Sequence, residues 1–292
     1  MSYNSDRINI HELTVEEPEK QEGLPFDPER DLTEEDWVNM KKQLEKYKIE
    51  EDWSKFSEHA MAMRVIDPDI DLGIEDTDWE NMETQLNDFR ENATSWGQHQ
   101  WANFASQASK MKIIDSTGDL RLDQAVWNGM NSRLSKYKKD KEWSGCSWLA
   151  MCMKILDPSI KLDFSEEDWV CIKDLAGKST NVDINSIQFL AEIKIINPDI
   201  HFKLSDENWA NIKDILDQVR NSQLNPSGTN GVGVLAYVGG VGVWHNFSVQ
   251  AMLMKILAAE EVRVTDEGLQ IKMTKDQPLK SDTLPIPETK QF

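Results

Sequence analysis

The apolar residues of this chain recur with the spacing of one helix face, and they do so in successive copies. Five tryptophans begin similar segments, and apolar residues follow each of them three and seven positions later. These tryptophans are Trp37, Trp79, Trp127, Trp169 and Trp209. Offsets of 0, 3 and 7 follow one face of an α-helix. The pattern therefore predicts that each of these tryptophans lies near the start of an amphipathic helix.

The residue four positions before each tryptophan is suited to begin that helix in most copies. These residues are Thr33, Glu75, Asp123, Ser165 and Ser205. Thr, Asp and Ser are good N-caps, whereas Glu is a poor one. An apolar residue precedes each of them, so it and the tryptophan occupy the two positions of a hydrophobic staple. The acidic residues just before the tryptophan complement the helix dipole, so they have a structural explanation and need not be a binding motif.

A second apolar stripe follows in each unit and ends at a basic residue between aliphatic neighbours. These basic residues are Arg64, Lys112, Lys154, Lys194 and Lys255. In three copies an Asp-Pro or Asn-Pro pair follows, and such a pair predicts the end of a helix. A short alternation such as Ile160, Leu162 and Phe164 then predicts an extended connector that seals the boundary between units.

Each unit therefore contains two helices and is about 40–48 residues long, as two-helix solenoid repeats are. The sequence predicts an all-α protein of about five such repeats stacked as an α-solenoid, because near-equal repeats favour stacking of neighbours. A compact multi-helix bundle is the alternative fold.

The repeat divides the chain into three parts. Residues 1–30 contain many acids and several prolines, and they predict an acidic N-terminal arm. Residues 31–258 form the helical repeat domain. Its units are about 31–73, 74–121, 122–163, 164–203 and 204–258. Residues 259–292 are a C-terminal tail in which the alternation around Gly268 is compatible with a small hairpin, followed by a disordered end.

The fifth unit contains a glycine-rich insert at residues 225–243, between its two helices. The insert is apolar and carries no charged residue, so it is a candidate contact loop, with a hairpin and a plain linker as alternatives. Its candidate binding residues are Val234, Leu235, Tyr237 and Val238. Its glycines complete neither the GxxxxGK nor the GxGxxG pattern, which disfavours nucleotide binding.

Two further features are candidate contact sites. Trp96 and Trp148 fall outside the repeat registers, and tryptophan is enriched at interface hot spots. In stacked units the five basic residues of the second helices would form a row that could bind a polyanion. A cation near a helix C-terminus is also stabilised by the helix dipole and by pairing with the acid three residues on, which explains these residues without a ligand.

Composition narrows the function classes. The formal net charge of −20 disfavours a general nucleic-acid binder. The three cysteines and five histidines form no disulfide framework, zinc pattern or HExxH motif, so we expect no catalytic residue, metal or cofactor. We find no apolar run of transmembrane length and no secretory leader at the start of the chain, and we therefore expect a cytoplasmic protein without membrane insertion.

These observations predict a non-enzymatic helical-repeat interaction or scaffold protein, or a structural assembly subunit. It would present an extended surface to a protein partner or to a second copy of itself. The alternative is a nucleic-acid or polyanion-binding coat or packaging protein that uses the row of basic residues.

Overall fold

Each tryptophan-led helix begins one residue after its predicted N-cap. The computed structural model describes residues 27–96, 100–178, 184–200, 202, 204–222 and 243–273. In it these outer helices are α2 (Glu34–Ile49), α4 (Asp76–Trp96), α6 (Gln124–Asp140), α8 (Glu166–Lys178) and α10 (Asp206–Ser222). Thr33 and Asp36 form a reciprocal capping box at the start of α2. The rings of Phe164 and Trp169 lie 5.2 Å apart, as the predicted staple requires.

The second helix of each unit ends just after its basic residue. These inner helices are α3 (Trp53–Ile66), α5 (Gln100–Ile114), α7 (Trp143–Leu156), α9 (Ile184–Ile196) and α11 (Val243–Ala258). Asp67 is the C-cap of α3, and its carboxylate accepts a hydrogen bond from the backbone N–H of Asp69 at 3.0 Å. This Asx turn explains how the predicted Asp-Pro stop works. The same turn recurs after α5, α7 and α9.

The predicted acidic arm reaches the described part of the chain only at its end. Residues 28–30 belong to α1 (Pro28–Asp31), a short helix whose N-cap Asp27 accepts a hydrogen bond from the Glu29 N–H. This contact repeats the Asx turn of the unit boundaries. Residues 1–26 lie outside the described residues.

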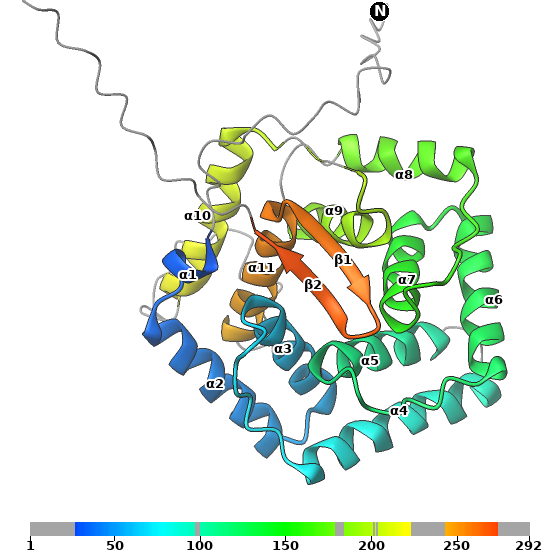
Figure 1. Ribbon diagram of the computed structural model, residues 1–292, viewed down its shortest axis with the longest axis horizontal. Helices are drawn as coiled ribbons and strands as arrows, with labels where there is room; N and C mark the ends of the chain where they lie inside the picture. The colour runs from blue at the N-terminus through cyan, green and yellow to red at the C-terminus, as the bar shows by residue number, and fades with distance from the viewer. Residues whose placement is uncertain are drawn as a thin grey trace, which may run out of the picture. The chain divides into compact units, whose positions relative to one another are not determined.

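The inner helices form a closed ring, whereas an open solenoid would leave its two ends apart. Each inner helix packs against the next, and α11 packs against α3, as Figure 1 shows. The outer helices lie around them, each on the inner helix of its own unit. In an open stack the end units need polar faces toward water. Here α11 of the fifth unit packs on α3 and α2 of the first, so the described region is mostly helical, as predicted, but its repeats do not form an extended stack.

The hydrophobic core lies between the outer and inner helices. The residue three positions after each tryptophan is at most 1% exposed in every unit. These residues are Met40, Met82, Met130, Ile172 and Ile212. The inner helices contribute Phe56, Phe104 and Phe247, which are equally buried. The amphipathic faces predicted from the sequence are therefore the faces that make this core.

Ion pairs join one outer helix to the start of the next. Lys48 of α2 lies 2.8 Å from Asp78 of α4, and Lys138 of α6 lies 2.8 Å from Asp168 of α8. Arg220 of α10 binds Asp36 of α2 through two nitrogens at 3.0 Å, which closes the ring with the same type of contact. The aspartate before the tryptophan thus binds the neighbouring unit as well as its own helix terminus.

A small antiparallel hairpin follows α11. Strands β1 (Glu261–Thr265) and β2 (Gly268–Lys272) pair with Val262 opposite Ile271, and they occupy the place where the sequence is compatible with a hairpin. Gly268 has a φ of +106°, a conformation that favours glycine at this turn. The hairpin contacts α5, α7 and α9 and lies across the ring in Figure 1. Among the described helices, none is long and apolar enough to cross a membrane.

Candidate functional site

A cavity of about 410 Å³ lies inside the ring of inner helices. Side chains of all the inner helices line it, and Leu269 of β2 adds an apolar contact from the hairpin. Sites for small organic molecules typically have volumes of about 300–1,000 Å³ and mainly apolar walls with a few polar groups. The cavity meets both criteria, and we consider it the candidate functional site.

Three positions of the repeat build most of the cavity wall. Counted from the basic residue of each inner helix, they lie one position after it, three before it and six before it, which is one helix face. The position after the base is the aliphatic level: Val65, Ile113, Ile155, Ile195 and Ile256. The middle level is Met61, Ser109, Met151, Ala191 and Met252. The mixed level, six before the base, is Glu58, Ser106, Trp148, Gln188 and Val249.

The two ends of this wall differ in chemistry. The aliphatic level is β-branched in every unit, as a packing position is. Gly268 of the hairpin lies near the carbonyl of Lys112 in the last turn of α5, and Leu269 lines the cavity, so the hairpin borders the end of the cavity where the inner helices terminate. The mixed level carries an acid, a hydroxyl, an indole, an amide and an aliphatic group. Its side chains are therefore not interchangeable packing units.

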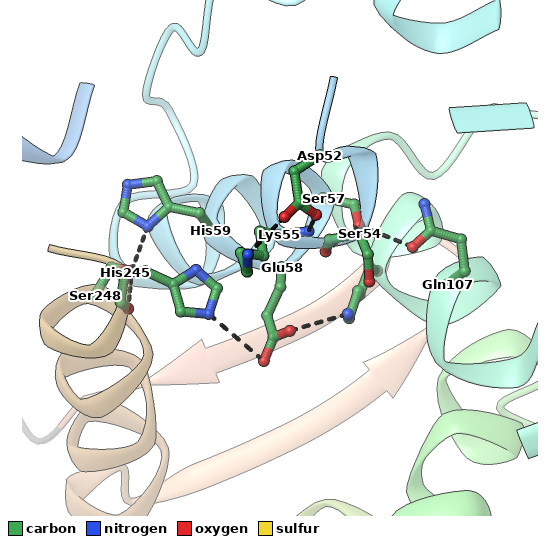
Figure 2. Close-up of polar contacts among 10 residues, drawn as sticks. Asp52, Ser54, Lys55, Ser57, Glu58, His59, Gln107, His245 and Ser248 are labelled. Atoms are coloured by element: carbon green, nitrogen blue, oxygen red, sulfur yellow. Dashed lines mark hydrogen bonds and ion pairs between the residues drawn. The ribbon is translucent and has the colours of Figure 1, made fainter. Parts of the chain in front are cut away.

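A charged cluster lies on the α3 and α5 side of the wall (Figure 2). Lys110 Nζ lies 3.1 Å from Glu58 Oε2, and His245 Nε2 lies 4.0 Å from Glu58 Oε1. Burial alone would raise the pKa of Glu58, but the attraction of Lys110 and His245 outweighs it, so this pKa lies below its usual value. Glu58 is thus ionised and neutralised by a cation of the protein itself.

His59, beside this cluster, is a structural residue. Its Nε2 donates to the Met40 carbonyl at 2.8 Å, and its Nδ1 lies 2.7 Å from the Ser248 hydroxyl. A neutral imidazole with its proton on Nε2 satisfies both contacts. Burial lowers the pKa of His59 to about 3, so the ring stays neutral at physiological pH. These bonds join α3 to α2 and α11.

Glu192 of α9 is a second buried carboxylate in the wall, and its surroundings differ from those of Glu58. It is 4% exposed and accepts hydrogen bonds from the Ser147 hydroxyl at 2.6 Å and the Gln188 amide at 2.9 Å. Both donors are neutral. Burial raises the pKa of Glu192 to about 7, because these two bonds only partly offset the loss of hydration.

The two buried thiols are unreactive near neutral pH. Cys152 lies in the cavity wall, and Cys146 lies in the core. Burial raises the pKa of both thiols to about 12, so the reactive thiolate form is not populated near neutral pH. Within the described residues, no group of three His, Cys, Asp or Glu side chains is placed to hold a metal ion.

Of the six predicted contact residues in the insert and at Trp96 and Trp148, the structure describes the side chain of Trp148 alone, and it lies in the cavity. Trp148 belongs to the mixed level and is half-buried in the wall. Trp96 is the last residue of α4, and its side chain is not among those described. Val234, Leu235, Tyr237 and Val238 lie outside the described residues. The insert predicted at 225–243 is described only from Val243, which is the first residue of α11.

Each basic residue of the predicted row donates to backbone carbonyl oxygens. Arg64, Lys112 and Lys154 bind the carbonyl four residues further on, in place of the predicted pairing with the side chain three residues on. Lys194 binds the carbonyls of Leu257 and Ala259, and Lys255 binds that of Ile66. Lys194 and Lys255 are 6% and 8% exposed, so the five cations do not form one accessible row. Binding of a polyanion by the more exposed members stays a prediction.

Sequence reasoning did not single out Glu58, Lys110 or Glu192. A signal was present, because Lys110 and Glu192 occupy the same repeat position, two before the base, where the other units have Ala62, Cys152 and Leu253. A charged residue at an otherwise apolar position of a repeat indicates a specific local role. Comparisons of the chain with protein-family models, curated proteins and solved structures found no match.

Proposed function

We propose that this chain is a non-enzymatic binding protein whose ring of inner helices holds a small molecule with a mainly apolar body. The observation that carries the proposal is the contrast between the levels of the cavity wall. A uniform aliphatic level provides the apolar surface, and a mixed level provides Glu58 and Trp148 at places where the other units have different chemistry. Small-molecule sites combine an apolar wall with a few placed polar groups in this way.

The states of Cys152, His59 and Glu58 support binding over catalysis by these three residues. The Cys152 thiol is protonated because burial raises its pKa to about 12. The two ring nitrogens of His59 are occupied by Met40 and Ser248. Glu58 is held by Lys110. The thiol is therefore protonated and the other two groups are bound to partners of the protein, whereas a nucleophile or general base needs a reactive form that faces its substrate.

The proposal keeps the non-enzymatic character predicted from the sequence, but it replaces the predicted protein partner with a small molecule and moves the site to the interior of the ring. Closure replaces the concave groove of an open solenoid with the cavity. Contact with a protein partner through residues 225–243 stays a prediction, because residues 225–242 lie outside the described part of the chain.

Methionine methyl groups allow a direct test. Met61, Met151 and Met252 line the cavity, whereas Met40 and Met82 lie in the core outside its lining. We expect cyclohexylmethanol, a neutral apolar probe, to shift the ¹³C-methyl signals of the three cavity methionines in a saturable way. The signals of Met40 and Met82 should change little.

A pair of matched variants serves as the control. Ala191→Trp fills the cavity wall with an indole and should abolish the saturable shifts. Ala125→Trp adds the same group at an exposed position of α6 and should leave them unchanged. If the wild-type methyl signals show no saturable response, or respond equally inside and outside the cavity, the proposed function is wrong.

A further inference from the structure

We propose that the molecule held in the cavity carries an ammonium group that pairs with Glu192. This inference rests on the proposed function and names its ligand class, an apolar primary or secondary amine. It is argued from the charges of the wall, the free acceptor sites of Glu192 and the apolar surface around them.

The charges of the cavity wall do not balance. Among the described lining residues, those with formal charges are Glu58, Lys110 and Glu192. Lys110 and Glu58 neutralise each other across 3.1 Å. Glu192 therefore leaves one carboxylate in the wall whose hydrogen-bond donors, Ser147 and Gln188, are both neutral. A buried charge without a counter-ion is costly, and a cationic ligand would remove that cost.

The carboxylate of Glu192 is held in place and still has acceptor capacity. Gln188 lies one helical turn before it on α9 and donates to Oε1, and Ser147 of the adjacent α7 donates to Oε2. One bond to each oxygen fixes the orientation of the carboxylate. An ionised carboxylate has about four acceptor sites, so about two stay available for an ammonium group.

The rest of the wall suits the apolar part of such an amine. The aliphatic level and Leu269 of the hairpin offer hydrocarbon surface at the end where the inner helices terminate. An anionic ligand would meet Glu192 with like charge, and a neutral alcohol would leave that charge in place. Burial raises the pKa of Glu192 to about 7, as expected for a carboxylate whose donors among the described residues are neutral, and an ammonium partner would lower that pKa.

Three probes of the same shape test the inference at pH 8, where Glu192 is ionised. They are cyclohexylmethylamine, cyclohexylmethanol and cyclohexanecarboxylate, and the methionine methyl titration gives the affinity of each. We expect the amine to bind at least about tenfold more tightly than the alcohol, since hydrogen bonds to charged groups are worth that much. The carboxylate should bind most weakly.

Two variants identify the carboxylate responsible. Glu192→Gln keeps an acceptor for Ser147 and should lower the affinity for the amine to that for the alcohol, while affinity for the alcohol stays within about twofold. Glu83→Gln removes one carboxylate from an exposed position of α4 and should leave the preference for the amine unchanged.

The outcomes separate this inference from the proposed function. Equal binding of amine and alcohol by the wild type overturns the inference but keeps the cavity as a binding site. A preference for the amine that survives in Glu192→Gln also overturns it. If none of the three probes shifts the cavity methionines, the proposed function itself is wrong. Should Glu192→Gln not fold, the comparison of the three probes on the wild type still decides.

Discussion

Two regions of the ring contain buried polar side chains, and the partners of these side chains differ between the two regions. The first is the closure seam, where α3 meets α11, with His59, Ser248 and Lys255. There His59 bonds to two groups, and Lys255 donates to the last carbonyl of α3 at 2.8 Å. The second is the α7–α9 wall of the cavity, where Glu192 is held by the neutral donors Ser147 and Gln188. His59, Ser248 and Lys255 thus find partners across the seam, whereas the donors to Glu192 among the described residues are both neutral side chains.

The comparison distinguishes polar groups that hold the fold from those available to a ligand. Burial is similar in the two regions, because His59 is 0% and Glu192 is 4% exposed. What differs is whether the protein supplies the complementary partner. A fully partnered buried group adds specificity to the fold, but a partly partnered one costs stability until something else pairs with it. Removing a seam residue should therefore destabilise the protein, and neutralising Glu192 should stabilise it.

The largest expected effect is at the seam. His59→Ala removes an imidazole that is fully buried and leaves the Met40 carbonyl and the Ser248 hydroxyl without their partner. We expect the free energy of unfolding to fall by about 3–5 kcal/mol, the range for large-to-small core substitutions with an added polar loss. Urea unfolding followed by circular dichroism measures it.

Ser248→Ala is the control for this prediction. It removes the partner of His59 Nδ1 but keeps the ring and its bond to Met40, so it should cost only about 1–2 kcal/mol. A loss below about 1 kcal/mol in His59→Ala would mean that the seam adapts easily, and the contrast between the two regions would then fail.

The helices were predictable from the sequence because they depend on local interactions. Spacing of apolar residues, N-caps and Asx-Pro stops each act within a few residues, and α2 begins one residue after Thr33 as its cap predicts. Closure of the ring was not predictable in this way. It depends on a rotation accumulated over successive units and on contacts such as His59 with Ser248, which lie 189 positions apart in the chain.

The sequence does not predict the cavity, for a different reason. A helix that is apolar on all sides is buried on all sides, so its sequence does not reveal which face borders a cavity. On α9, Ile193 packs in the core with Ile172, whereas Ile195 lines the cavity, although both read as apolar positions of one helix. Trp148 stands out in the sequence because it falls outside the repeat registers. Only the closed ring explains that its place is the cavity wall.

The second prediction is that a substitution at Glu192 stabilises the protein, whereas His59→Ala destabilises it. The pKa of Glu192 is about 7 in the folded protein and 4.5 as a reference value, so the folded state holds its proton to higher pH. Protonated Glu192 therefore contributes to the free energy of unfolding. This contribution is fully present below pH 4.5 and is lost as the pH rises through 7, which lowers the free energy of unfolding by about 3 kcal/mol. Glu192→Gln removes this loss. It should equal the wild type near pH 4.5 and be more stable at pH 8, as measured by urea unfolding at both values.

Glu58→Gln, in the same cavity, should change the stability in the opposite direction. The pKa of Glu58 is lowered by Lys110 and His245 despite burial, so its ionised form stabilises the fold. This variant should be less stable than the wild type at neutral pH, and the difference should shrink as the pH falls below the usual pKa of a glutamate. If Glu58→Gln and Glu192→Gln changed the free energy of unfolding in the same direction at pH 8, the two carboxylates would not differ in the way that their surroundings indicate.

The smallest expected effect is a difference in coupling energy between two ion pairs. One pair closes the ring, and the other joins two consecutive units. Arg220 binds Asp36 through two nitrogens, whereas Lys138 binds Asp168 through one. Each aspartate also accepts the backbone N–H of its helix cap. Double-mutant cycles with alanine subtract that cap and leave the coupling energy of the pair. We expect the Arg220–Asp36 coupling to exceed the other by about 1 kcal/mol, because two-point arginine contacts are stronger. Equal couplings would mean that closure adds no special stabilisation at the outer helices, and that the seam is held at the inner helices alone.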